Sequence, residues 1–239
     1  MPPAGADRPE TGGVWFEVAP VYAGRADFER DFAGFGEAPG SHPNIARAVA
    51  LVDAWPVGAA QARALVHVLH AAVDPAEDGD DGWAVVASSS HSYDDAFGSL
   101  WATVHSPVGL AEAIVHEMAH HKLRACGVGF TTAERLVANH PDERYPSPLL
   151  DGRRRPMPAL VHAHYALLHM VALETAILAG GDPRARPVAG ALRRRHLDLL
   201  RESDATLGRH LVVDEAGAAF VPAMRRWQRR LLDRTEALT

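Results

Sequence analysis

The chain has 239 residues, of which 47% are hydrophobic and 23% are charged, and this suits one globular domain better than two. The net charge of −6 is spread over interspersed acids and bases, so nothing indicates a nucleic-acid or membrane-surface binder. A single cysteine, Cys126, excludes an internal disulfide framework. No uninterrupted apolar run reaches about 20 residues, and no secretion signal opens the chain, so we expect a cytoplasmic protein without membrane spans.

The first third of the chain alternates between structured and unstructured patterns. Pro/Gly-rich residues 1–13 are predicted to be a disordered tail, followed by a single domain over 14–239. Apolar residues at helical spacing predict helices over 44–55 and 58–73. The acidic segment 74–82 is dense in turn formers and is expected to be an exposed loop.

Two short segments have a strand pattern. Residues 82–90 and 97–104 are rich in Val, Trp, Phe and Ser, and they predict a pair of β-strands joined by a turn. No other segment has a convincing strand pattern. Next, Ser106 as N-cap, a proline after it and Gly127 beyond the end predict a helix over 107–125.

Helices dominate the remainder of the chain. Thr131, with Glu134 three residues later, suggests the start of a short helix. Apolar spacing predicts longer helices over 158–181, 187–206 and 214–235. The sequence therefore predicts an α+β fold that is mainly α. We expect a motif helix beside a small antiparallel sheet, as in zincin-like folds, followed by a C-terminal helical bundle.

The predicted helix over 107–125 contains the motif H-E-x-x-H, formed by His116, Glu117 and His120. Helical residues four apart lie over one another, so the two imidazoles can bind one divalent metal ion. Glu117 points about 100° away from His116 and is expected to handle protons rather than bind the metal. A chain with 14 histidines can contain the motif by chance, but the Ala, Ile, Val and Met around it favour a metal site.

A catalytic metal ion normally has a third protein ligand. Metzincin peptidases supply it from a histidine six residues after the motif, but Cys126 occupies that position, which excludes this class on its own pattern. A later predicted helix offers His162, His164 and His169, with Glu174 as a carboxylate alternative. His162 and His169 share one helical face and His164 lies nearly opposite, so at most one set faces the metal.

Other polar residues have two interpretations. His121 points away from the motif face, and we expect it to pair with Glu117 rather than bind metal. The basic segments 193–196 and 225–230 are expected to be solvated helix faces, although they could attract an acidic peptide. Four residues of the predicted sheet region either line a substrate groove or are ordinary turn and strand residues: Ser90, His91, Tyr93 and Ser99.

Four segments between Asp53 and Glu174 occur in a recognisable order: DAWP, HSYDDAFGSLWATVHS, LAEAIVHEMAHHKL and RRRPMPALVHAHYALLHMVALE. In order and approximate spacing they resemble the HExxH-type peptide-modification proteins of ribosomal-peptide gene clusters. These proteins are also described as 2-oxoglutarate-dependent HExxH peptide β-hydroxylases. In the last segment, Arg155 and Pro156 match the family's Arg-Pro, and His162 matches a histidine shortly before Tyr-Ala.

The resemblance implies an oxygenase that uses Fe(II) and 2-oxoglutarate to hydroxylate a Cβ position in a peptide, with a ribosomal precursor peptide as substrate. It implies His116, His120 and His162 as metal ligands, with His164 in reserve. In such a set, a histidine replaces the carboxylate usual in non-haem iron oxygenases.

The distal carboxylate of 2-oxoglutarate needs a cation, and the bidentate guanidinium of Arg155 is our choice. Arg153 and Arg154 remain open alternatives, and such a run is also commonly a solvated patch.

The runner-up function is a zinc metallopeptidase, with Zn(II) as the metal and Glu117 as general base. It leaves the segment from Arg155 to Tyr165 without a role. A non-catalytic scaffold is a third possibility.

Overall fold

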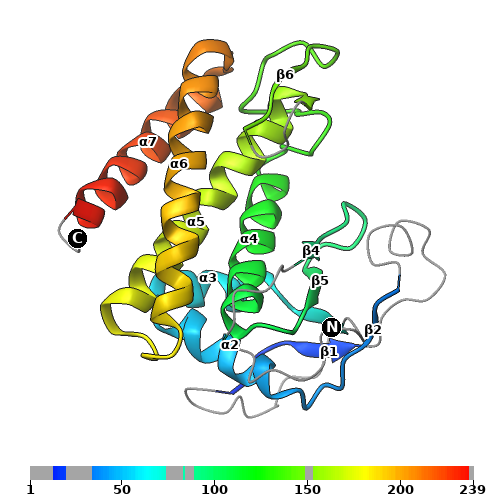
Figure 1. Ribbon diagram of the computed structural model, residues 1–239. Helices are drawn as coiled ribbons and strands as arrows, with labels where there is room; N and C mark the ends of the chain where they lie inside the picture. Colours follow the sequence, from blue (N-terminus) through cyan, green and yellow to red (C-terminus); the bar gives the residue numbers. More distant parts are fainter. Residues whose placement is uncertain (1–12, 20–33, 74–82, 84–88, 149–152, 237–239) are drawn as a thin grey trace.

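The computed structural model describes residues 13–19, 34–73, 83, 89–148 and 153–236 (Figure 1). Within these ranges the elements are, in order, β1 (Glu17–Ala19), β2 (Gly36–Glu37), α2 (Pro43–Asp53), α3 (Pro56–Leu65), β3 (Val68–Val73), β4 (Ser90–His91), β5 (Ser99–Thr103), α4 (Pro107–Ala125), β6 (Tyr145–Pro146), β7 (Arg154–Arg155), α5 (Met157–Gly180), α6 (Arg186–His210) and α7 (Glu215–Glu236). The predicted mainly α, α+β fold is confirmed. The acidic loop 74–82 and all but the last residue of the predicted tail lie outside the described residues.

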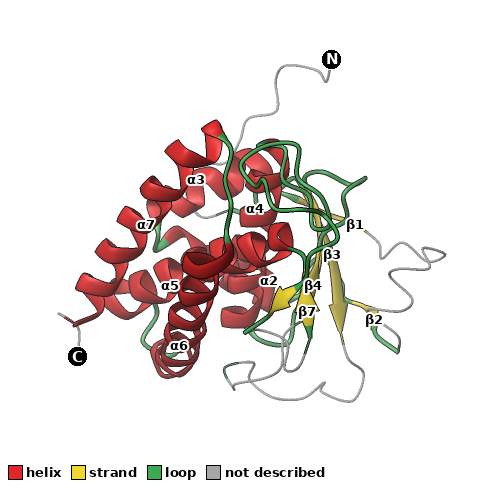
Figure 2. Ribbon diagram, turned by 90° about the horizontal axis from the view of Figure 1, so that it is seen from above, coloured by secondary structure: helices red, strands yellow, loops and turns green. Residues whose placement is uncertain are grey.

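The larger described sheet has the strand order β1-β3-β5-β4, and β2 also pairs with β3. β1 and β5 run parallel to β3, whereas β4 runs antiparallel to β5. The sheet is therefore mixed, and the prediction of an antiparallel sheet was wrong. The helices lie to one side of it (Figure 2). Of the predicted strand pair, β5 lies within the predicted range 97–104, and β4 overlaps the predicted range 82–90 at Ser90 alone. Residues 82 and 84–88 of that range lie outside the described residues.

The predicted helix over 58–73 is only partly helical. α3 ends at Leu65, and residues 68–73 form β3, which lies between two parallel neighbours. Four of the six residues of β3 are buried, and a strand covered on both faces has an apolar run that spacing alone does not separate from a helix. The prediction of a helix is therefore confirmed for residues 58–65 and wrong for residues 68–73.

The short helix predicted after Thr131 is also absent from the described structure. The N–H of Glu134 donates to the carbonyl of Gly127, and the N–H of Gly129 donates to the carbonyl of Thr132. Isolated bridges join Val128 to Ala133 and Val137 to Val213. The backbone groups of this segment therefore make their hydrogen bonds within turns and with the residues before α7.

α4 and α5 form the centre of the helical layer, and α5 also packs against α6 and α7 (Figure 1). Nearly all residues of α4 and α5 are buried. Among the described residues, α5 alone is long and apolar enough to cross a membrane, but 72% of that span is buried in the protein, as in a core helix. Each polar group on these two helices therefore needs a partner inside the protein.

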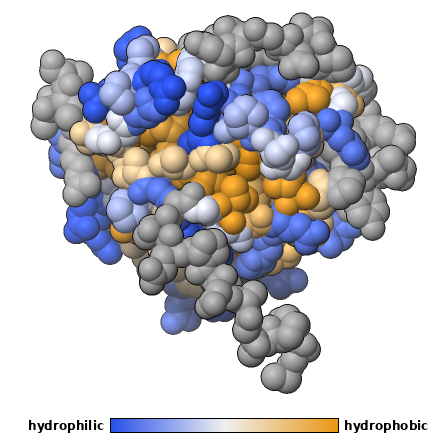
Figure 3. Space-filling model, turned by 90° about the horizontal axis from the view of Figure 1, so that it is seen from below, coloured by the Kyte–Doolittle hydropathy of each residue, from blue (hydrophilic) through white to orange (hydrophobic). Residues whose placement is uncertain are grey.

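The surface seen from below has a central apolar area bordered by hydrophilic residues (Figure 3). Among the described residues, the large apolar side chains that are exposed are Val14, Val57, Phe97 and Val212. They belong to four different segments of the chain, so they do not make up one apolar helix face.

Candidate metal centre

His116 and His120 face one another on α4. Nε2 of His116 lies 2.8 Å from Nε2 of His120. Two nitrogens bound to one ion at about 2.1 Å and at right angles are about 3.0 Å apart, so the pair can share an ion with little adjustment. His120 is buried, whereas 30% of the His116 side chain is exposed, which leaves one side of the pair accessible. Among the described residues, the potential ligand atoms of His116, Glu117 and His120 all lie within 4.8 Å of one another.

The ends of α4 are formed by the predicted capping residues. Ser106 Oγ accepts a hydrogen bond from the N–H of Gly109, at 3.3 Å. At the other end Gly127 has φ of +82°, the left-handed conformation that glycine adopts without strain. The N–H of Gly127 donates to the carbonyl of Arg124, and that of Val128 donates to the carbonyl of Leu123. This turn reverses the chain and brings Val128 back beside the helix.

His162 on α5 contacts both this turn and the motif. Its Nε2 donates to the carbonyl oxygen of Val128 at 2.8 Å, and its Nδ1 lies 3.1 Å from Nδ1 of His120. Because a carbonyl oxygen only accepts, a neutral His162 carries its proton on Nε2 and accepts from His120 at Nδ1. His120 then has an unprotonated Nε2 facing His116, which is the form that binds a metal ion.

Burial keeps these rings neutral. It lowers the pKa of His162 to about 4, and together with His116 it holds the pKa of His120 well below its usual value. Burial also lowers the pKa of His116. Since metal ions bind neutral imidazole, the centre is ready to bind a metal ion at pH 7 without first losing protons.

The structure thus brings His162 to His120, at the ring edge opposite the one that faces His116. In this arrangement His162 orients His120 and does not belong to the group of potential ligand atoms. Its predicted role as third ligand stays a prediction.

The other two histidines of α5 have different partners. Nδ1 of His164 lies 3.1 Å from Ser203 Oγ, and its Nε2 lies 3.1 Å from Gln228 Oε1. Nε2 of His169 accepts from Nζ of Lys122 at 3.0 Å. The reserve ligand His164 is therefore held between α5, α6 and α7, away from the motif pair.

Glu117 lies beside His116, with Oε1 3.8 Å from Nε2 of that ring. The carboxylate is buried, and each of its oxygens accepts a hydroxyl hydrogen bond: Oε1 from Ser90 at 2.7 Å and Oε2 from Ser92 at 2.5 Å. These serines lie on and directly after the edge strand β4, so the sheet positions the carboxylate.

The predicted pairing of His121 with Glu117 is wrong, because Nε2 of His121 donates to the carbonyl of Ser99 at 3.2 Å.

Arg124 was not singled out from the sequence, yet it supports Glu117 through Ser92. It donates to the Ser92 carbonyl at 2.7 Å and to the Ser92 hydroxyl at 3.0 Å, and it pairs with Asp94 at 2.7 Å. Its guanidinium also lies over the ring of Phe130. Arg124 follows Glu117 by seven residues, about two helical turns, and this spacing is the signal that could have revealed it.

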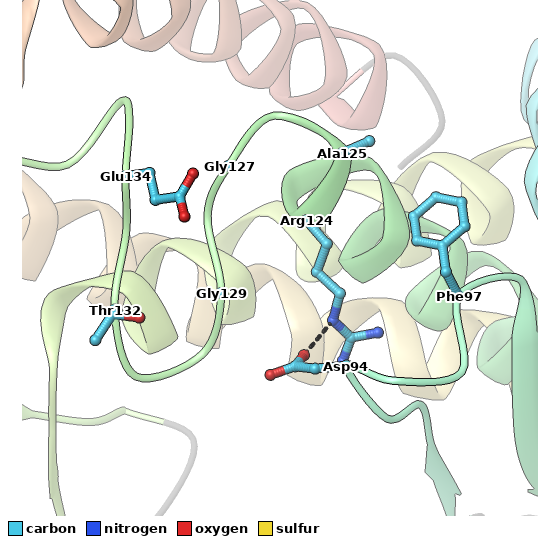
Figure 4. Close-up of a pocket in the computed structure, with 8 residues that line it drawn as sticks. All are labelled: Asp94, Phe97, Arg124, Ala125, Gly127, Gly129, Thr132 and Glu134. Atoms are coloured by element: carbon cyan, nitrogen blue, oxygen red, sulfur yellow. Dashed lines mark ion pairs between the residues drawn. The ribbon is translucent and has the colours of Figure 1, made fainter.

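A pocket of about 380 Å³ lies beside the last turn of α4 (Figure 4). The Asp94–Arg124 ion pair forms part of its wall, and Thr132 and Glu134 lie across from it. Its lining residues are Asp94, Phe97, Arg124, Ala125, Gly127, Gly129, Thr132 and Glu134. None of the motif residues lines it, so Arg124 is the connection between this pocket and the residues that hold Glu117.

Of the three consecutive arginines before α5, Arg155 is the one that is half-buried. Burial, and then the charge of Arg153, lower the pKa of Arg155, and its own charge contributes to the low pKa of His162. The backbone of Arg155 pairs with Tyr145 of β6, but no hydrogen bond or ion pair involves its guanidinium within the part of the chain that is described. Arg154 is exposed and donates to the carbonyl of Arg144 at 2.6 Å.

Glu174, the carboxylate alternative for the third ligand, does not join the motif pair. It is buried with Glu112 and His196 in a separate group. The predicted solvated face at 193–196 is therefore wrong in part, since Arg193 is only 6% exposed and His196 contacts Glu174.

Ser92→Ala is expected to lower the free energy of unfolding by about 1–3 kcal/mol, because it leaves the buried Oε2 of Glu117 without its hydroxyl partner. Urea denaturation measures the change. Ser89→Ala, at an exposed neighbouring position, is the matched control and should change stability by less than about 0.5 kcal/mol. Equal effects of the two substitutions would contradict a supporting role for Ser92.

No protein-family model and no curated protein matches the chain. The assignment of the candidate metal centre therefore rests on the geometry of its residues.

Proposed function

We propose that the chain is an Fe(II)- and 2-oxoglutarate-dependent oxygenase that hydroxylates a Cβ position in a peptide, with a ribosomal precursor peptide as substrate and the cytoplasm as its location. The observation that carries a metal-dependent activity is the 2.8 Å separation of the facing Nε2 atoms of His116 and His120. The choice of reaction is supported by the resemblance of the Asp53 to Glu174 region to HExxH-type peptide β-hydroxylases.

The residues present fit a divalent ion. His116 and His120 would hold it through Nε2, while His162 either keeps His120 in its metal-binding tautomer or, as the resemblance implies, turns to become a ligand. Bound Fe(II) with 2-oxoglutarate and dioxygen supplies oxidation of a C–H bond to an alcohol, coupled to decarboxylation of the cosubstrate to succinate. Glu117, fixed 3.8 Å from Nε2 of His116, places a negative charge beside the site.

Arg155 is our candidate for binding the distal carboxylate of 2-oxoglutarate. A half-buried guanidinium without a partner among the described residues is costly, and a carboxylate would satisfy it with charge-assisted hydrogen bonds. The exposed Arg153 and the bonded Arg154 fit this role less well. Arg155 also precedes His162 by seven residues and ends β7 just before α5 begins, so the two residues are close in the chain.

Arg155→Ala is expected to raise the 2-oxoglutarate concentration needed for half-maximal succinate release about 10- to 100-fold, the effect of losing a charged hydrogen bond. Metal content should not change, since Arg155 is not a ligand in this proposal. Arg154→Ala is the matched control. An unchanged 2-oxoglutarate requirement in Arg155→Ala would remove Arg155 from the site.

Anaerobic reconstitution with Fe(II) and 2-oxoglutarate tests the proposed activity. The complex is expected to have a visible charge-transfer band, and admission of oxygen should release succinate. Absence of the band, together with Zn(II)-dependent cleavage of a peptide, would instead favour a metallopeptidase.

The zinc metallopeptidase remains the second candidate because Glu117 lies where a general base for water would be needed. The antiparallel edge strand β4 beside it also offers backbone groups to an extended peptide. It takes second place because both oxygens of Glu117 already accept serine hydroxyls and because it gives Arg155 no role.

A further inference from the structure

A second group of polar side chains is buried between three helices. Glu112 of α4, Glu174 of α5 and His196 of α6 have potential ligand atoms that all lie within 4.8 Å of one another. Nδ1 of His196 is 2.5 Å from Oε1 of Glu174. Glu174 is fully buried, Glu112 is 8% exposed, and 12% of the His196 side chain is exposed.

The two carboxyl groups of this group are incompletely satisfied. Their potential ligand atoms lie within 4.8 Å of each other, yet Oε1 of Glu112 and Oε2 of Glu174 have no hydrogen-bond partner in the described structure. Burial raises the pKa of Glu112 well above its usual value and that of Glu174 to about 8. A pair of buried carboxylates needs either a shared proton or a cation, because their mutual repulsion is weakly screened inside a protein.

Arg193 is the charged neighbour that could neutralise the pair. It lies one turn before His196 on α6, is only 6% exposed, and its charge lowers the pKa of Glu174. However, its Nε and Nη2 atoms make no hydrogen bond within the described residues. These two donors therefore do not satisfy the free carboxylate oxygens.

We propose that Glu112, Glu174 and His196 form a second binding site for a divalent metal ion, separate from the His116–His120 pair. Two carboxylates and one imidazole suit Mn²⁺, Fe²⁺ or Zn²⁺, and two negative charges balance the ion. The unpartnered oxygens of the two glutamates supply the donors that the fold leaves unused. Carboxylate and histidine side chains converging from neighbouring helices are also how helical bundles build metal sites.

The two sites share one helix. Glu112 precedes His116 by four residues, a rise of about 6 Å along α4, and His196 contributes to the lowered pKa of His116. α4 therefore presents Glu112, His116 and His120 at successive turns of one face. The second site does not depend on which reaction takes place at the first.

The proposal is tested by Mn²⁺ stoichiometry. The full chain is stripped with a chelator, equilibrated with Mn²⁺ by dialysis, and analysed by elemental mass spectrometry and electron paramagnetic resonance. The wild-type chain is expected to bind two ions, and the double variant His116→Ala/His120→Ala is expected to keep one. Retention of none by this variant would overturn the second site and leave the proposed function intact.

Isosteric substitution identifies the ligands of the second ion. Glu174→Gln should lose one Mn²⁺ while keeping the other, and combined with the double histidine variant it should bind none. Glu202→Gln, at an exposed position of α6, is the matched control and should bind two. Circular dichroism checks that each variant is folded. If folded Glu174→Gln retained two ions, the assignment of Glu174 as a ligand of the second ion would be overturned. If both the wild type and the double histidine variant retained one ion, the second site would stand and the His116–His120 site would be contradicted.

Discussion

His120→Ala is expected to lower the Mn²⁺ content by one ion per chain and to abolish metal-dependent turnover. Half of the facing nitrogen pair would be lost, and the Nδ1 of His162 would lose its donor. Elemental analysis after dialysis measures the ion content, and succinate release measures turnover. His140→Ala, at an exposed position, is the matched control and should leave both unchanged. An unaltered ion content in His120→Ala would refute the candidate metal centre.

His162→Ala separates a supporting role from a ligand role. If His162 acts through His120, as the hydrogen bonds indicate, metal affinity should fall by about 10- to 100-fold and the ion should return at higher concentration. Complete loss of the ion at all concentrations would show that His162 is a ligand, as the resemblance implies. His164→Ala should keep wild-type affinity, because that ring contacts Ser203 and Gln228.

Acid is expected to destabilise the chelator-treated protein steeply between pH 6.5 and 4. Burial lowers the pKa of His164 to about 4 and that of His169 to about 3, whereas both rings titrate near 6.5 when unfolded. Below pH 6.5 the unfolded chain therefore binds protons that the folded chain does not. As the pH falls below 6.5, each ring lowers the free energy of unfolding by up to about 1.4 kcal/mol per pH unit. Above pH 6.5 the rings are neutral in both states and the stability is not reduced.

Urea denaturation at a series of pH values measures this slope. His164→Gln removes one of the two rings, so the dependence of the free energy of unfolding on pH should correspond to about one proton fewer taken up on unfolding. His140→Gln, on the surface, should leave it unchanged. A free energy of unfolding that stays constant from pH 6.5 to 4.5 would show that these rings do not remain neutral in the fold.

The motif helix was predictable because its signals are local. Ser106 and Gly127 define α4 within a few neighbouring residues, and the i, i+4 spacing places His116 and His120 together whatever the rest of the chain does. The long helices of the C-terminal half were found for the same reason. Their ends differ by at most a few residues from those predicted.

β3 was missed because its conformation is decided by distant partners. VLHAAV is compatible with a helix, and pairing with β1 and β5 on either side makes it a strand. The role of His162 was hidden for a similar reason. Its tautomer depends on the carbonyl of Val128, which only the turn at Gly127 brings into reach.

The second cluster had a partial sequence signal. Glu112, His116 and His120 follow one another at intervals of four residues, which could have indicated a longer polar face on α4. Its partners Glu174 and His196 lie on two other helices, and no spacing rule joins them to Glu112. His196 in particular follows three arginines, a context that suggested a solvated surface.

The polar contacts between α4 and α5 also determine how these helices align. α5 is apolar over most of its circumference, so hydrophobic packing alone would tolerate sliding by one turn. Two polar pairs, His120 with His162 and Glu112 with Glu174, run in opposite directions along the two helices. A shift of one turn would separate both pairs inside the core, so these contacts select a single antiparallel register.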